Sequence, residues 1–125
     1  MEQFIYEDLT YKLRGIFFDV QNAIGYGYRE KIYCQAICKS LNPNNLHFEY
    51  QVRVPVVFEN ESIANRYIDF IIEDKIVVEI KVGDRVPNSH FNQLKEYLNL
   101  TGYKLGLLVV FRKNEVKIFR IANLY

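Results

Sequence analysis

Hydrophobic residues in the first forty positions recur with the spacing of helices. Residues three or four apart fall on one side of a helix, and such a stripe runs through Leu9, Leu13, Ile16, Phe17, Val20 and Ile24. Gly25-Tyr26-Gly27 interrupts the pattern, as glycine does at a helix end. A second stripe, at Ile32, Tyr33, Ala36 and Ile37, predicts a helix from about Tyr28 to Leu41. Asn42-Pro43-Asn44-Asn45 ends this second helix.

The rest of the chain is dominated by β-branched and aromatic residues in short runs, which predict strands. The predicted elements are strands at His47–Glu59, Ser62–Ile72 and Lys75–Val82, a helix at about Ser89–Thr101, and strands at Leu105–Arg112 and Glu115–Ile121. Pro55 indicates that the first strand is an edge strand or contains a bulge. Leu105–Arg112 is almost continuously apolar, which is typical of a strand covered on both faces.

The element order is therefore ααβββαββ. We expect an α/β (α+β) fold in which helices flank a central mixed sheet. The chain has 125 residues and half of them are hydrophobic, which is enough for one core and too little for two. With no linker or repeat in between, residues 1–125 are expected to form a single domain.

Charge and composition exclude several classes of protein. Sixteen Lys and Arg against fifteen Asp and Glu leave a net charge of +1, which argues against a generally basic nucleic-acid coat protein. Charges interrupt the N-terminal segment and no apolar run reaches about 20 residues, so neither a signal peptide nor a membrane span is indicated. Cys34 and Cys38, the two cysteines, have no second ligand pair. We expect a cytoplasmic protein with reduced thiols.

Two acidic residues, Asp69 and Glu79, lie in otherwise apolar strands. The register of this hairpin follows if the apolar residues share one core face: Ile68, Phe70, Ile72, Ile76, Val78 and Ile80. A three-residue loop at 73–75 satisfies this condition. Asp69 then lies directly opposite Glu79 on the other face, and Tyr67 lies opposite Lys81.

Opposed carboxylates repel each other, so this arrangement needs a compensating cation. Lys81 supplies part of the positive charge. Two carboxylates and a backbone carbonyl form a ligand set that suits Mg²⁺. The alternative is a solvated hairpin face, on which these side chains form surface pairs worth about 0–1 kcal/mol.

The spacing of these residues is similar to a known signature. Asp69, nine residues and then Glu79-Ile80-Lys81 resemble the PD-(D/E)XK nuclease motif, although Ile68 replaces its proline. Residues Gly27–Tyr33 read G-x-x-E-x-x-Y, the motif of the GxxExxY proteins in that superfamily. The resemblance continues through Glu49-Tyr50-Gln51-Val52, Gln93, Tyr97-Leu98 and Leu105-Gly106-Leu107-Leu108.

The resemblance implies a restriction-endonuclease-like core and a magnesium-dependent phosphodiesterase site, with Mn²⁺ as a second candidate ion. Asp69 and Glu79 would be metal ligands and Ile80 would offer its carbonyl oxygen, while Lys81 would be the catalytic lysine. Two further residues would complete the catalytic set: Glu30 as an additional acid on a helix, and Gln93 as a helix glutamine that orients the site. From the residues alone, the helix dipole is the better explanation of Glu30, and surface positions are the better explanation of Gln93 and His90.

Five cations between Lys104 and Arg120 face a single acid, Glu115, and form the one basic patch in the sequence. The expected substrate contacts are Lys104, Arg112 and Lys113 from this patch, Arg85 from the loop before the last helix, and Tyr97 beside Gln93. A solvated face of an outer strand explains the patch equally well.

The sequence therefore predicts a metal-dependent nuclease that acts on nucleic acid, with DNA as the first expectation. Two alternatives remain open. One is a catalytically silent module that assembles as a homodimer or with a protein partner, for which nineteen Phe and Tyr residues provide apolar surface. The other is a nucleic-acid binder that no longer cleaves.

Overall fold

The computed structural model describes residues 5–123. Its elements follow the predicted order and are α1 (Glu7–Ile24), α2 (Glu30–Leu41), the short 3₁₀ helix η2 (Asn42–Asn44), β1 (Phe48–Phe58), β2 (Glu61–Ile72), β3 (Ile76–Val82), α3 (Asn88–Thr101), β4 (Leu105–Phe111) and β5 (Val116–Ala122). Within the described residues, no helix combines the length and apolar character needed to cross a membrane.

The five strands form one mixed sheet in the order β1-β2-β3-β4-β5. Only β3 and β4 are parallel, and α3 connects them, whereas the other neighbouring strands are antiparallel. Pro55 lies on β1, an edge strand as expected, where its missing N–H costs no central hydrogen bond. A register shift between Val56 and Val57 supplies the bulge as well.

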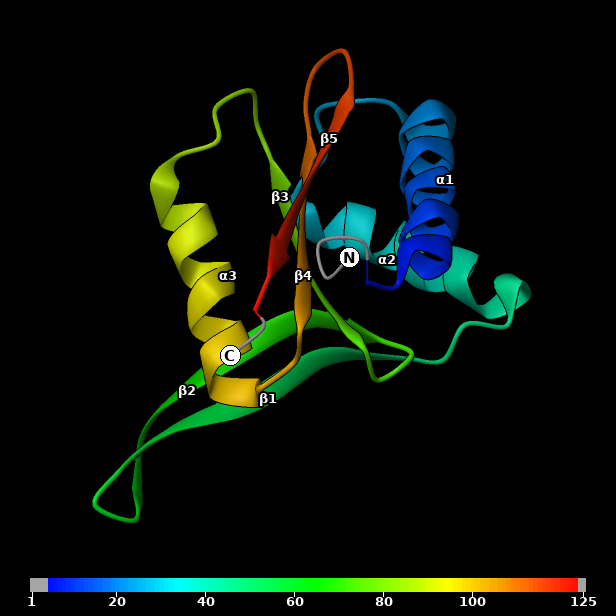
Figure 1. Cartoon of the computed structure of the whole chain (residues 1–125). Helices are drawn as coiled ribbons and strands as arrows, with labels where there is room; N and C mark the ends of the chain where they lie inside the picture. Colours follow the sequence, from blue (N-terminus) through cyan, green and yellow to red (C-terminus); the bar gives the residue numbers. More distant parts are fainter. Residues whose placement is uncertain (1–4, 124–125) are drawn as a thin grey trace.

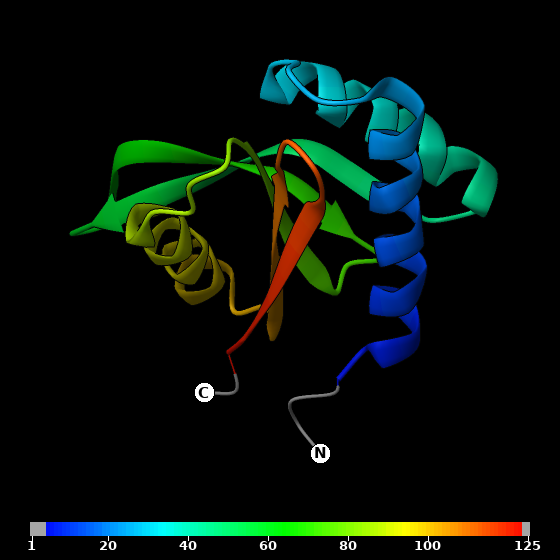
Figure 2. The same ribbon diagram turned by 90° about the horizontal axis from the view of Figure 1, so that it is seen from above.

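Helices cover both faces of this sheet (Figures 1 and 2). The helices α1 and α2 pack on one face, and α3 packs on the other. Strand β4 lies between the two layers, and all seven of its residues are buried. A strand covered on both faces was the expectation for this apolar run, and it is confirmed.

The α1 stripe is confirmed as the core-facing side of that helix, with Leu13 and Phe17 fully buried. On α2 the buried side includes Tyr33, Cys34 and Ile37, whereas Ile32 is only half-buried. The Tyr33 ring stacks on Phe111 of β4 with 4.2 Å between ring centroids. Its hydroxyl donates to the carbonyl of Gly25 at 2.6 Å. This aromatic pair holds the start of α2 over the end of β4.

Along β2, the side chains that point to each helical layer change at Asp69. Phe70 belongs to the core under α1 and α2, whereas Ile68 belongs to the core under α3. The expectation that Ile68 shares a face with Phe70 is therefore wrong. Opposite Asp69 on β1, Gln51 has a positive φ of 57° and makes no ladder pair. The regular alternation of faces breaks at this point in both strands.

Close contact between α3 and the sheet depends on Gly106 of β4. A Cβ atom at this position would lie 2.8 Å from a methyl group of Leu94 on α3. We expect Gly106→Ala to lower the free energy of unfolding by about 1–3 kcal/mol, because α3 or Leu94 must move away. Gly15→Ala is the matched control, since Gly15 lies inside α1 and nothing would contact its Cβ. That variant should gain about 0.5–1 kcal/mol in urea unfolding. Equal free energies of unfolding for Gly106→Ala and Gly15→Ala would contradict this account of the contact between α3 and the sheet.

Candidate functional site

The β2–β3 hairpin has the predicted register, but its ladder is shorter than predicted. Ile72 pairs with Ile76 and Phe70 pairs with Val78. The loop at 73–75 is confirmed, and Lys75 N–H donates to the carbonyl of Ile72 at 3.0 Å. The ladder ends at Phe70, so the pairs expected further along, Asp69 with Glu79 and Tyr67 with Lys81, do not form. Strands β2 and β3 separate at this point.

The two acids occupy the gap where the strands separate. Glu79 accepts a hydrogen bond from the backbone N–H of Asp69, with 3.0 Å between the nitrogen and Oε1. Asp69 accepts one from the backbone N–H of Ile80, with 2.8 Å to Oδ2. Each carboxylate thus bonds to the backbone of the opposite strand and takes the place of a ladder carbonyl. This reciprocal contact brings the two acids together.

Burial makes this pair of acids electrostatically costly. Glu79 is 3% exposed and lies on the α3 side of the sheet, aligned with Leu108 and Phe119. Burial and the neighbouring charge of Asp69 raise the pKa of Glu79 to about 9. Burial also raises the pKa of Asp69, although the Ile80 N–H, a hydrogen bond with Glu79 and the charge of Lys81 oppose the shift. A cation between the carboxylates would remove the cost of ionising both.

Lys81 lies close enough to act on every acid of this cluster. Its charge lowers the pKa values of Asp69, Glu79 and Glu30. It does not form a direct ion pair with them: the ion pairs found between residues 5 and 123 join Arg66 to Glu96 and Arg112 to Glu115. Lys81 is thus a neighbouring positive charge that leaves room between itself and the acids.

Helix α2 contributes Glu30, its first residue, from the other side of the sheet. Glu30 lines a pocket of about 470 Å³ together with Lys31, Cys34, Tyr50, Gln51 and Asp69. The walls of this pocket shield Glu30 in part and raise its pKa, and the charge of Asp69 adds to the shift. The structure thus brings Glu30 to the cluster, as the sequence motif predicts. Cys34 is a free, buried thiol in the same pocket.

Helix α3 approaches the cluster with its first turns. Gln93 is half-buried and lies one turn after His90 and one turn before Tyr97. His90, which the sequence suggests is exposed, is half-buried instead, and this burial, together with the charge of Lys81, lowers its pKa. Its Nδ1 atom is shielded from solvent and has no partner within the described residues. The sequence singles out His90 by its one-turn spacing from Gln93 but favours an exposed position for it, and that expectation is wrong.

Tyr97 does not fit the role of a substrate contact. Its side chain is 2% exposed, and its hydroxyl donates to the backbone carbonyl of Tyr67 on β2 at 3.1 Å. The preceding residue on the same helix, Glu96, forms an ion pair with Arg66 of β2 at 2.9 Å. These contacts tie β2 to α3 just before Asp69. Tyr97 therefore supports the position of β2.

The basic residues do not form the single patch that the sequence suggested. Lys104 precedes Leu105, which pairs with Ile76 at the far end of β3 from Lys81. Arg120 points towards α1, where its guanidinium donates to the Thr10 hydroxyl and the Ile5 carbonyl, each at 2.8 Å. Neither of these two residues lies with the acids.

The remaining cations gather at the end of the sheet that carries Lys81. Lys117 aligns with Lys81 across Val110, so the two lysines share the α3 side of the sheet, about 10 Å apart. The backbone N–H of Lys113 donates to the Asp84 carboxylate at 3.0 Å, which joins the β4–β5 turn to the loop containing Arg85. Arg112 and Lys113 thus lie near Arg85, as their expected role requires.

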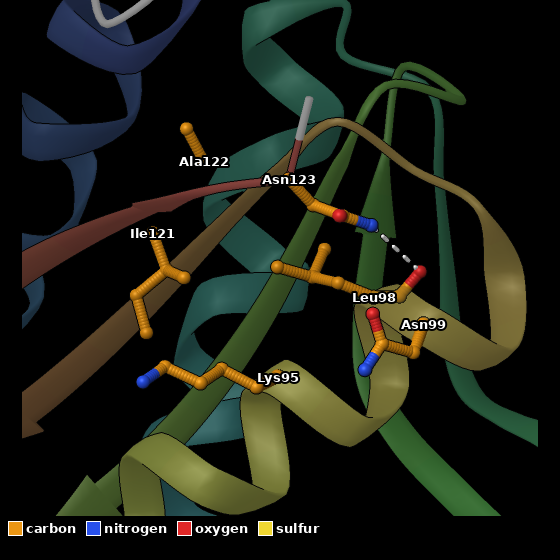
Figure 3. A pocket seen from close by; sticks show the side chains of 6 residues that line it. All are labelled: Lys95, Leu98, Asn99, Ile121, Ala122 and Asn123. Atoms are coloured by element: carbon orange, nitrogen blue, oxygen red, sulfur yellow. Dashed lines mark hydrogen bonds between the residues drawn. The ribbon is translucent and has the colours of Figure 1, made fainter. Parts of the chain in front are cut away.

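Another pocket, of about 210 Å³, lies away from this cluster (Figure 3). It is formed by the second half of α3 and the end of β5, and its lining residues are Lys95, Leu98, Asn99, Ile121, Ala122 and Asn123. The Asn123 amide donates to the Leu98 carbonyl at 3.2 Å across it. These six residues include no acid, so this pocket lacks the chemistry of the Asp69 cluster.

The donor set at the gap is suited to a hard divalent cation. No three His, Cys, Asp or Glu side chains between residues 5 and 123 form a metal cluster by themselves. Besides the two carboxylates, the backbone offers an oxygen donor. In a strand, the N–H and C=O of one residue face the same neighbour, so the Ile80 carbonyl faces the side where its N–H meets Asp69. Two carboxylates and this carbonyl are all-oxygen ligands of the kind that Mg²⁺ prefers.

Comparisons with known proteins agree with this architecture. The family model described as the PD-(D/E)XK nuclease superfamily matches residues 7–121. The fold also resembles the crystal structure of SSO0001, with a TM-score of 0.60 and 24% sequence identity. That match covers 74% of this chain and 49% of SSO0001, so the chain spans about half the length of this structural relative. No curated protein matches the chain.

The mixed sheet, its flanking helices and the acids in the gap define a restriction-endonuclease-like fold, and the expected fold class is confirmed. This chain belongs to the PD-(D/E)XK nuclease superfamily.

The raised pKa of Glu79 predicts how stability depends on pH without divalent ions. Between the ordinary pKa of 4.5 and about 9, the folded protein holds a proton that the unfolded chain releases. The free energy of unfolding should therefore fall as pH rises from 5 to 9, by at most about 1.4 kcal/mol per pH unit. Glu79→Gln should flatten this dependence in urea unfolding with a chelator present. Glu96→Gln, at an exposed ion pair, should not flatten it. A parent protein that is equally stable throughout this range would contradict the shift.

Proposed function

We propose that this protein is a metal-dependent nuclease that hydrolyses phosphodiester bonds in nucleic acid, and that it belongs to the GxxExxY branch of its superfamily. The single observation that carries the proposal is the reciprocal contact of Asp69 and Glu79 across the gap between β2 and β3. A buried acid next to a half-buried one opposes folding when both are ionised, unless a cation compensates their charge. Superfamily membership and the position of Lys81 support the same function.

In this proposal, Asp69 and Glu79 bind Mg²⁺ or Mn²⁺ together with the Ile80 carbonyl. When bound, the ion supplies positive charge that activates a water molecule and neutralises phosphoryl oxygens. Lys81 lies beside the acids without forming an ion pair, so its ammonium group is available to stabilise the charge that develops on the phosphate. Glu30 holds or accepts a proton at the rim of the pocket, and Gln93 orients water or phosphate from α3.

The nucleic acid extends from the acids across the ends of β3, β4 and β5. Arg85, Arg112 and Lys113 surround this end of the sheet, and Lys117 lies beside Lys81. These cations contact phosphates and add affinity that does not depend on base sequence. Lys104 and Tyr97 take no part in binding, because of their positions.

Substitutions at the acids and at Lys81 test the chemistry separately. Asp69→Asn should abolish both cleavage of a labelled oligonucleotide and calorimetric binding of Mg²⁺ or Mn²⁺, because one ligand charge is lost. Lys81→Ala should retain metal binding and lose cleavage by about 10²–10³-fold or more, because it removes transition-state stabilisation alone. Lys104→Ala should behave like the parent protein. Unchanged cleavage in both site variants would exclude the mechanism, and retention of nucleic acid without products would indicate a binder instead.

Because the basic residues lie at separate ends of the sheet, their substitution should affect nucleic-acid binding to different extents. Lys113→Ala and Lys117→Ala should weaken nucleic-acid binding and each reduce the slope of log K against log salt by about 0.7–0.9. Lys104→Ala, at the opposite end of β4, should leave affinity and slope unchanged. Filter binding at several salt concentrations measures both quantities. Equal losses for Lys104 and Lys113 would show that phosphates do not follow this end of the sheet.

A further inference from the structure

The motif Glu49-Tyr50-Gln51-Val52 lies on β1, and the catalytic scheme above assigns it no role. The structure places two of its residues, Tyr50 and Gln51, in the same pocket as Asp69 and Glu30. Helix α2 forms one wall of this pocket, β1 forms the other, and Asp69 lies between them. The pocket therefore opens directly beside the proposed position of the scissile phosphate.

Tyr50 provides a fixed aromatic surface in this pocket. Its ring lies against that of Phe70, with 5.1 Å between centroids and 41° between planes. Phe70 is fully buried and belongs to the core, whereas Tyr50 is 37% exposed. The tyrosine is thus held by the core on one side and remains open to the pocket. Such rings stack nucleobases of any sequence.

Gln51 is held beside Tyr50 in an unusual conformation. Its φ of 57° inside a strand is the left-handed region that non-glycine residues rarely adopt. The same conformation interrupts the ladder opposite Asp69, and the Gln51 amide lies 3.4 Å from Asp69 Oδ1. Strain of this kind persists at functional sites because surrounding contacts enforce it. An amide carries both a donor and an acceptor, which are the groups that recognise a base edge.

We infer that the pocket between α2 and β1 is a subsite for one unpaired nucleobase next to the scissile phosphate, with the base stacked on Tyr50. This inference rests on the proposed nuclease function and names its substrate class, a single strand or an unpaired end. The pocket volume of about 470 Å³ lies within the range of small-ligand sites. A base that enters between α2 and β1 exposes its edge to Gln51, so it cannot remain paired. Lys31, on the same pocket, meets the adjoining phosphate.

Binding of 2-aminopurine oligonucleotides by the uncleaving Lys81→Ala variant tests this subsite apart from catalysis. With Mg²⁺ present, a single strand should bind at least about tenfold more tightly than the same sequence in a blunt duplex. Adding Tyr50→Ala should weaken single-strand binding by about tenfold and abolish the fluorescence change from stacking. Adding Tyr50→Phe should preserve both. Tyr11→Ala is the matched control, because Tyr11 lies on α1 and is 79% exposed.

Gln51→Gly removes the side-chain amide without endangering the fold, because glycine adopts a positive φ without strain. Weaker single-strand binding with unchanged or higher stability supports the subsite. Equal affinity for single strand and duplex, or a Tyr50→Ala variant that binds like its parent, overturns the subsite and leaves the nuclease function standing. If Lys81→Ala binds neither oligonucleotide and the parent protein with Mg²⁺ cleaves neither, both the subsite and the nuclease function are overturned.

Discussion

Two hydrogen bonds in the gap between β2 and β3 organise the whole site. In an ordinary hairpin the backbone groups of Asp69 and Ile80 would pair with the opposite backbone. Here the carboxylates of Glu79 and Asp69 accept those N–H groups, at 3.0 and 2.8 Å. The strands can separate without leaving unpaired buried amides, which would cost about 1–3 kcal/mol each. The same bonds hold the buried Glu79 and the half-buried Asp69 side by side.

Both helical layers contribute residues near the place where the strands separate: Glu30 shares a pocket with Asp69, and the charge of Lys81 acts on His90. Glu30 comes from α2 on one face of the sheet, whereas Gln93 and His90 come from α3 on the other. A continuous sheet would keep these layers apart. The contacts of Tyr97 and Glu96 with β2 hold the strand in its diverging course. Supporting residues of this kind are as necessary to the arrangement as the acids themselves.

The parts of the fold that were predictable depend on local patterns. The helical stripe of α1, the apolar run of β4 and the turn at 73–75 each follow from residues close in sequence. The register at Phe70 was predictable because a one-residue slip would bury Asp69 in the core. Ile68 could not be placed correctly, because the change of face at Asp69 depends on Gln51 of another strand. His90 and Tyr97 likewise took their positions from contacts across α3 and the sheet.

The sequence by itself determined which elements form, their order, and that Asp69, Glu79 and Lys81 belong to one hairpin. Local spacing is sufficient for this, since the periods of helices and strands decide which side chains share a face. Only the tertiary structure decided that the ladder stops before the acids and that Glu30 shares a pocket with Asp69. It also separated Lys104 and Arg120 from the other cations. These features depend on packing between distant segments, which no local pattern encodes.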